Sequence, residues 1–167
     1  MPAPRDLAQT LAVQYAYTAW VFTKTLEGIS HAESLTQPAP AGNCLNWVAG
    51  HIVATRMGTL ELLGENTLWE DHWRERYRRG SDAVRDGGDA ADIAEIVRAF
   101  GASQDPLMQA LPGLKPDRLD APAPYSPGND PDETVGSLLA GLAFHESYHC
   151  GQLGVLRRLL GKDGIIK

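Results

Sequence analysis

The sequence has little of what two large protein classes depend on. Only two cysteines, Cys44 and Cys150, occur among its 167 residues, too few for the disulfide framework of a small secreted domain. Its 15 basic residues are outnumbered by 21 acidic ones, leaving a net charge of −6, whereas a nucleic-acid-binding protein needs a basic surface. These shortages argue against a disulfide scaffold and against a nucleic-acid partner.

Long apolar runs and strand-like alternation are missing as well. The longest apolar stretch, Leu138 to Phe144, is interrupted by Gly141 and is far shorter than the roughly 18 residues that span a bilayer. The chain opens on MPAPRDLAQT, which is polar and unlike a signal peptide. No stretch alternates apolar and polar residues with a period of two. We therefore expect a cytoplasmic, all-α protein without a membrane partner.

Apolar residues instead recur every three or four positions in four stretches, a period typical of helices with one buried face. Loops rich in proline and glycine separate the stretches. The spacing predicts one domain over residues 1–167, a four-helix bundle with long crossover connections. The four helices are expected over residues 6–29, 43–63, 90–111 and 130–160.

Capping residues suggest where these helices begin and end. Asn43 and Asp130 are the expected N-caps of the second and fourth helices, and Gly64 and Gly161 the expected terminators. Pro106 should kink or split the third helix. The arginine- and tryptophan-containing segment 65–89 is expected to be a crossover connection with a short helix near residues 69–77.

The predicted inner face of the fourth helix is interrupted by three consecutive polar residues, His145, His149 and Gln152. An unpaired buried imidazole costs about 1–3 kcal/mol, but two at positions i and i+4 can converge on one metal ion. His51 interrupts the second helix in the same way. Three imidazoles on facing helices predict a metal site with open coordination positions, and a polar core network without an ion is the alternative. The stripe reads Val135, Leu138, Leu142, His145, His149, Gln152, Leu156 and Leu159.

Residues 145–149 also match the pattern HExxH, in which Glu146 would act as the catalytic base on metal-bound water. The extended protease pattern needs glycine and histidine where the chain has Gln152 and Val155, and no glutamate follows Glu146. Peptide hydrolysis is therefore disfavoured. Hydrolysis of another substrate, with Glu146 as base, is kept as an alternative.

Two fragments resemble the DinB family. In the last predicted helix, His145, His149, Gly151 and Gln152 are followed by Leu-Arg-Arg-Leu-Leu-Gly over residues 156–161. In the second helix the fragment is Asn-Trp-Val-Ala-Gly-His over residues 46–51. The order of the parts also agrees, and the resemblance extends over about residues 7–161.

The resemblance implies a four-helix bundle holding one divalent metal, often zinc or nickel, through His51, His145 and His149. The better-understood relatives are transferases or isomerases that use low-molecular-weight thiols such as bacillithiol or mycothiol, and homodimers are common among them. No thiol- or substrate-binding motif is recognisable in this chain.

Three hypotheses about the function follow. The leading hypothesis is a thiol-dependent S-transferase in which a metal-activated thiolate attacks a small electrophile. The alternatives are a metal-dependent hydrolase with Glu146 as base and a metal-stabilised bundle without turnover. Gln152 is a candidate to orient a ligand or substrate, whereas Tyr148 is expected to pack at a helix interface.

Overall fold

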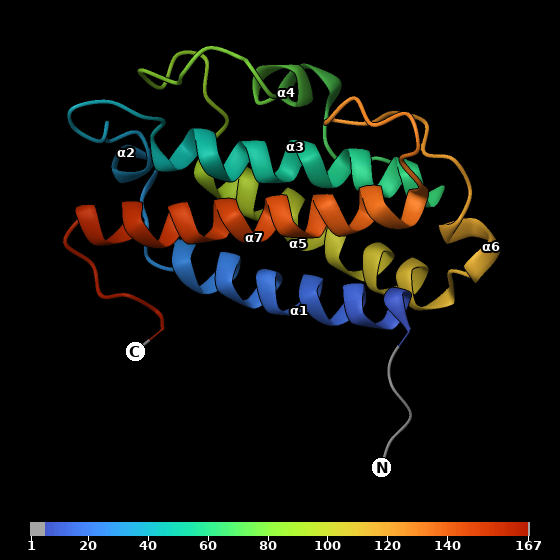
Figure 1. Ribbon diagram of the computed structural model, residues 1–167. Coiled ribbons are helices and arrows are strands. Elements are labelled where there is room, and N and C mark those ends of the chain that lie inside the picture. Colours follow the sequence, from blue (N-terminus) through green and yellow to red (C-terminus); the bar gives the residue numbers. More distant parts are fainter. Residues whose placement is uncertain (1–5, 167) are drawn as a thin grey trace.

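The computed structural model describes residues 6–166, and none of them belongs to a β-strand. Its four long helices are α1 (Leu7–Leu26), α3 (Leu45–Leu63), α5 (Ile93–Ala110) and α7 (Val135–Leu159). Each packs against two of the others, in the cyclic order α1, α7, α3, α5 (Figure 1). The predicted all-α fold is confirmed.

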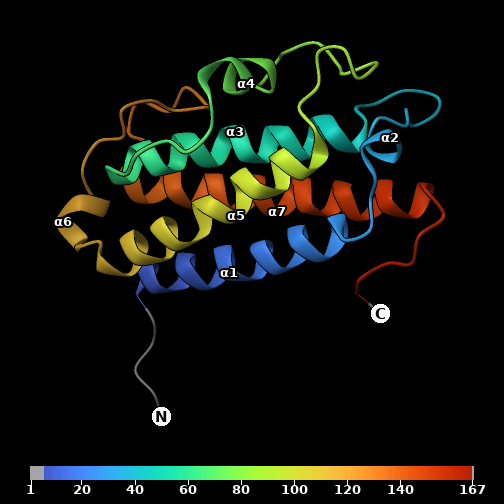
Figure 2. The same cartoon turned by 180° about the vertical axis from the view of Figure 1, so that it is seen from behind.

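Short helices lie in the connections between the long ones. Viewed from behind, α4 lies on the outer side of α3, and α2 and α6 lie at opposite ends of the bundle (Figure 2). No helix within residues 6–166 combines the length and the hydropathy that a membrane crossing requires. The short elements are α2 (His31–Ser34), α4 (Asp71–Arg76), the 3-10 turn η1 (Leu111–Gly113) and α6 (Pro116–Leu119).

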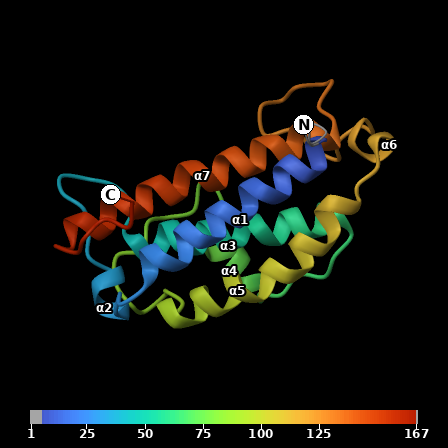
Figure 3. The same ribbon diagram turned by 90° about the horizontal axis from the view of Figure 1, so that it is seen from below.

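The directions of the long helices explain the crossover segment. Helices α1 and α7 run one way along the bundle, and α3 and α5 run the other (Figures 1 and 3). Because α3 and α5 are parallel, the chain between them has to return along the whole bundle. Residues 64–92 make this return over the outer side of α3 and include α4, as predicted.

Two of the predicted helix starts are wrong, because other residues cap the helices. Helix α3 is capped by Cys44 rather than Asn43. Helix α7 begins after Thr134, whose hydroxyl accepts a hydrogen bond from Ser137 N, four residues beyond Asp130. The chain before α7 instead forms a turn at residues 131–132 and then pairs with residues 121–123, where Val135 N donates to Ala121 O. Both predicted ends are confirmed by left-handed glycines, Gly64 with φ 84° and Gly161 with φ 75°.

Helix α5 runs through Pro106 without dividing. Proline removes one backbone donor and leaves the carbonyl of the residue four positions earlier without its helical partner. That residue, Ala102, is exposed, so water can reach its carbonyl. Of the two predicted effects of Pro106, a kink or a split, the split is wrong, because the helix is continuous.

Helix α7 follows the predicted inner stripe in its first half, where Val135, Leu138 and Leu142 are buried, and departs from it in its second half. Leu159, placed on the inner stripe, is 65% exposed, whereas Glu146, Cys150 and Leu153 are buried. The buried line therefore lies to one side of the predicted stripe. As a result His145 and His149 lie at the edge of the core, half-buried, rather than inside it.

Candidate metal centre

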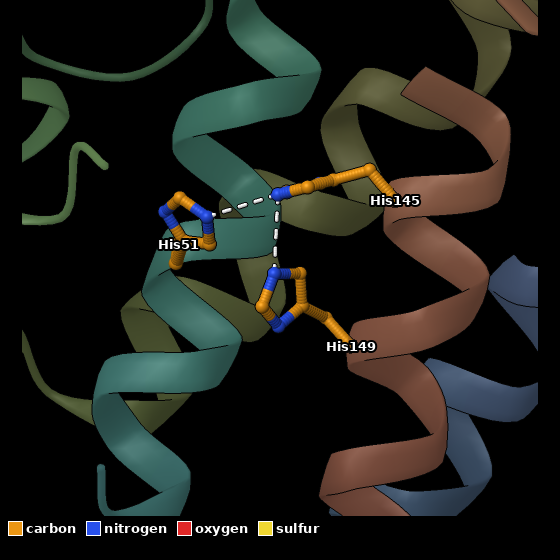
Figure 4. A group of neighbouring side chains, drawn as sticks. All are labelled: His51, His145 and His149. Carbon is orange, nitrogen blue, oxygen red and sulfur yellow. Dashed lines mark hydrogen bonds between the residues drawn. The ribbon is translucent and has the colours of Figure 1, made fainter. Parts of the chain in front are cut away.

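Three imidazoles converge between α3 and α7. Helix α3 contributes His51, and α7 contributes His145 and His149 one turn apart (Figure 4). The Nε2 atom of His145 lies 3.1 Å from Nε2 of His51 and 3.1 Å from Nε2 of His149. One nitrogen from each ring lies within 4.8 Å of the others. The structure thus brings together the three histidines that the sequence singled out.

Two of the rings are oriented by hydrogen bonds on their far side. The Nδ1 atom of His51 lies 2.8 Å from the carbonyl oxygen of Tyr77, and Nδ1 of His149 lies 2.6 Å from Oε1 of Gln152. In a neutral imidazole the nitrogen facing an oxygen acceptor carries the proton. The Nε2 lone pairs of His51 and His149 are therefore free to bind a metal. The predicted orienting role of Gln152 agrees with this contact.

The ring of His145 completes a donor set that fits a divalent cation. Its Nδ1 atom is buried and has no hydrogen-bond partner within residues 6–166, while its Nε2 atom faces two lone pairs. Two nitrogens held about 2.05 Å from a tetrahedral ion lie about 3.3 Å apart, close to the 3.1 Å between His145 Nε2 and each of the other two nitrogens. The ligand nitrogens of His51 and His149 lie within 4.8 Å of each other. A cation would bring the three lone pairs into favourable contact.

Burial keeps the three imidazoles neutral, as metal ligands must be. Removal from water lowers the pKa of His51 and of His149 below the usual value. The same burial, reinforced by the two neighbouring histidines and by Arg79, lowers the pKa of His145 to about 4. At neutral pH all three rings therefore present lone pairs rather than positive charges.

Tyr77, in the crossover segment, holds His51 in place and was not found from the sequence. Its ring lies directly over Gly50, where an added Cβ would come within 2.3 Å of it. Its hydroxyl donates to Asn46 Oδ1 at 2.7 Å and accepts from Ala91 N at 2.9 Å. Burial raises the pKa of Tyr77 to about 12, so this hydroxyl stays protonated. The fragment over residues 46–51 thus has a physical role, because it docks the crossover that orients a candidate ligand.

The structure does not bring Glu146 to the imidazoles. Its side chain points into the core, where its two oxygens accept hydrogen bonds from Arg56 Nε at 2.7 Å and Arg56 Nη2 at 2.8 Å. The hydroxyl of Thr18 donates to the same carboxylate. Glu146 is only 3% exposed. A carboxylate occupied in this way is not available to activate water beside His145.

The two remaining histidines of the chain lie outside the cluster, and Tyr148 lies at its edge. His72 is exposed and lies 3.2 Å from Glu70, and His31 is the first residue of α2, whose N-cap is Ser30. Tyr148 does not pack at a helix interface as predicted: it is 56% exposed, and its hydroxyl accepts a hydrogen bond from Gln152 Nε2 at 3.3 Å.

Two cavities, each of about 810 Å³, meet at the histidine cluster. The first extends toward α4 and the loop before α7, and the second toward the loop before α3 and the end of α7. Such volumes are typical of small-molecule sites. The residues that line both are His51, Arg79, His145 and Tyr148.

Comparison with known proteins places this architecture in a family. The chain is similar to the crystal structure of a conserved protein from Enterococcus faecalis, with a TM-score of 0.70 and 22% identity, over 95% of this chain and 100% of that one. No curated protein matches the sequence significantly. The family model of the DinB superfamily matches residues 14–153. The chain therefore belongs to the DinB superfamily.

Proposed function

We propose that the chain is a metal-dependent S-transferase that joins a low-molecular-weight thiol to a small electrophile. The convergence of three neutral imidazoles at the meeting point of two cavities carries this proposal. His51, His145 and His149 would hold one divalent ion, with zinc and nickel as the leading candidates. A site with three protein ligands leaves coordination positions open for a substrate.

An ion held by His51, His145 and His149 would supply Lewis acidity, lowering the pKa of a coordinating thiol, of which only a few per cent is ionised at neutral pH when free. The thiol proton passes to solvent, a sulfur–carbon bond forms, and the leaving group departs from the electrophile with the bonding electron pair. The protein's own contribution is orientation. The Tyr77 carbonyl and Gln152 hold two of the rings, and the two cavities accept the two reactants on either side.

Hydrolysis is less well supported than thiol transfer. It needs a base beside the bound water, and Glu146, the residue expected to supply it, is paired with Arg56 in the core. A metal-stabilised bundle without turnover remains the second candidate, since the same imidazoles would serve it. The two cavities favour thiol transfer over this candidate, because a purely structural ion needs no access for ligands.

Elemental analysis of purified protein tests the metal site first. We expect about one zinc or nickel ion per chain in the wild type, and its loss in His51→Ala, His145→Ala and His149→Ala. His72→Ala is the matched control, because this exposed histidine lies outside the cluster. Absence of metal from the wild type, even after incubation with zinc or nickel, would refute the proposal.

Thiol conjugation is then measured with metal-loaded protein, a panel of thiols and a chromogenic electrophile. We expect turnover that disappears in His145→Ala and persists in His72→Ala. Full metal occupancy without conjugation of any thiol would favour the metal-stabilised bundle instead. A homodimeric state and a cytoplasmic location stay predictions, to be measured by light scattering and by fractionation of cells.

A further inference from the structure

One arginine of the crossover segment differs from the others in having no partner. Residues 65–89 contain five arginines, and four of them bind side chains of the protein. Within the described part of the chain, the exposed side chain of Arg79 forms no hydrogen bond or ion pair. Its neighbour Arg78, by contrast, is paired with Glu75. The four pairs are Arg74–Glu61 at 2.9 Å, Arg76–Asp89 at 2.9 Å, Arg78–Glu75 at 3.0 Å and Arg85–Gln37 at 3.3 Å.

The position of Arg79 relates it to the histidine cluster. It follows α4 in the chain and lines both cavities, together with His51 and His145. A cation beside a cation site is unfavourable unless an anion lies between them. The guanidinium therefore lies where a ligand anion would be stabilised from two sides.

The two cavities differ in the residues that line them beyond this meeting point. The first is lined by charged side chains of α4, including Asp71, Arg74 and Glu75. The second is lined by apolar side chains near the end of α7, including Val155, Leu156 and Leu159. Apolar side chains, among them Leu138, Leu142 and Phe144, also line the first cavity, so the general character of the walls does not assign a charged molecule to either. Arg79 is instead the arginine that both cavities share.

We infer that Arg79 is a substrate-binding residue that pairs with an anionic group, such as a carboxylate, carried by a reactant bound at the histidine cluster. The inference rests on the proposed function for the nature of that reactant. Arginine suits the role because its planar guanidinium binds a carboxylate through two parallel hydrogen bonds. The substrates would thus be restricted to pairs in which one reactant carries a negative charge.

Matched probes test this inference on zinc-loaded protein by titration calorimetry. 3-Mercaptopropionate and 3-mercaptopropanamide have the same length and thiol but differ in charge. We expect the wild type to bind the carboxylate about tenfold more tightly, the size of one charge-assisted hydrogen bond. Arg79→Gln should abolish this preference. Retention of the preference in Arg79→Gln would overturn the inference.

Arg78→Gln is the matched control. Arg78 lines the first cavity too but is paired with Glu75, and its replacement changes the net charge equally. We expect it to keep the tenfold preference. An equal loss in both variants would also overturn the inference. The preference would then come from the overall electrostatic potential of this surface and not from a contact with Arg79.

Sulfur-free probes separate this inference from the proposed function. Propionate and propanamide are titrated into metal-free protein and followed by NMR, where the preference for the anion again depends on Arg79. If no thiol binds the zinc-loaded protein while this preference persists, thiol transfer fails and the anion site stands. If both thiols bind equally, the anion site fails and thiol transfer stands.

A competition experiment shows which reactant carries the anion. If propionate and 3-mercaptopropanamide compete, the anionic group belongs to the thiol; if they bind simultaneously, it belongs to the electrophile.

Discussion

Helix α7 contributes to two polar clusters. His145 belongs to the first, and its neighbour Glu146 belongs to the second. The histidine cluster (His51, His145 and His149) lies between two cavities and leaves buried nitrogen without a partner. The inner cluster, centred on Arg56 and Glu146, is sealed in the core. Its remaining members are Thr18, Ser103 and Gln104.

The inner cluster is closed and its members bind one another. Arg56 is 1% exposed, donates twice to Glu146 and donates through Nη1 to Gln104 at 2.8 Å. Its guanidinium carbon lies 3.8 Å from the centre of the Phe100 ring. These contacts join all four long helices, since Thr18 belongs to α1. The contrast teaches that a group of buried polar side chains is not by itself a ligand site. A ligand site also has polar atoms without hydrogen-bond partners and a cavity that leads to them.

Breaking the inner cluster should have the largest effect on stability. Arg56→Ala leaves the Glu146 carboxylate buried without its cation, which costs about 3–5 kcal/mol. Urea unfolding of metal-free protein measures this cost. The double variant Arg56→Met/Glu146→Leu should recover most of the loss, because it removes both charges. A single variant as stable as the wild type would contradict the structural role assigned here.

The histidine cluster should give the opposite result. His145→Ala should lower metal affinity by about 100-fold or more, as expected when one of three ligands is lost. It should lower the stability of the metal-free protein by less than about 1 kcal/mol, because the ring is half-buried and its Nδ1 atom has no partner to lose. Competition with a chromogenic chelator measures the affinity. A destabilisation as large as that of Arg56→Ala would erase the distinction between the two clusters.

Gly50→Ala should lower both the stability of the protein and its metal affinity. Its Cβ would meet the Tyr77 ring at 2.3 Å, displacing the crossover and the carbonyl that orients His51. We expect a loss of about 1–3 kcal/mol in stability, as for other overpacked sites, with weaker metal binding. Gly58→Ala is the control, since nothing lies within 4 Å of its Cβ in the same helix; it should stabilise the protein by about 0.5–1 kcal/mol. Equal effects of the two variants would contradict the docking of Tyr77.

The sequence was sufficient for the helices and for the three histidines, but not for the faces of α7. A spacing of three and four residues locates the buried face of a helix only to within one line of side chains along it. The line chosen contained Leu159 rather than Glu146 and Leu153. Glu146 stood outside the predicted line, as the base of the hydrolase alternative, and it lies in the core. Only tertiary packing distinguishes these lines, because the partner Arg56 is 90 positions away in the chain.

The crossover also could not be derived from local patterns. Tyr77 and Arg79 stand in a segment of mixed charge whose periodicity is weak. The role of Tyr77 becomes clear only from its contacts, because its ring lies over Gly50 and its hydroxyl donates to Asn46. Arg79 is distinguished from its neighbours by lacking a partner within residues 6–166 and by lining both cavities. Both properties are relations between distant residues, which a one-dimensional pattern does not contain.

The smallest effect is expected where the histidine cluster is supported from behind. Gln152→Leu removes the acceptor 2.6 Å from His149 Nδ1 and should weaken metal binding about tenfold, at the low end for residues that orient a ligand. Stability should barely change, because Gln152 is half-buried at the edge of the bundle. The control is Gln152→Glu, which keeps an acceptor and should keep the affinity. If both variants bind metal as tightly as the wild type, the orientation of His149 comes from the helix alone, and the cluster is more rigid than its hydrogen bonds imply.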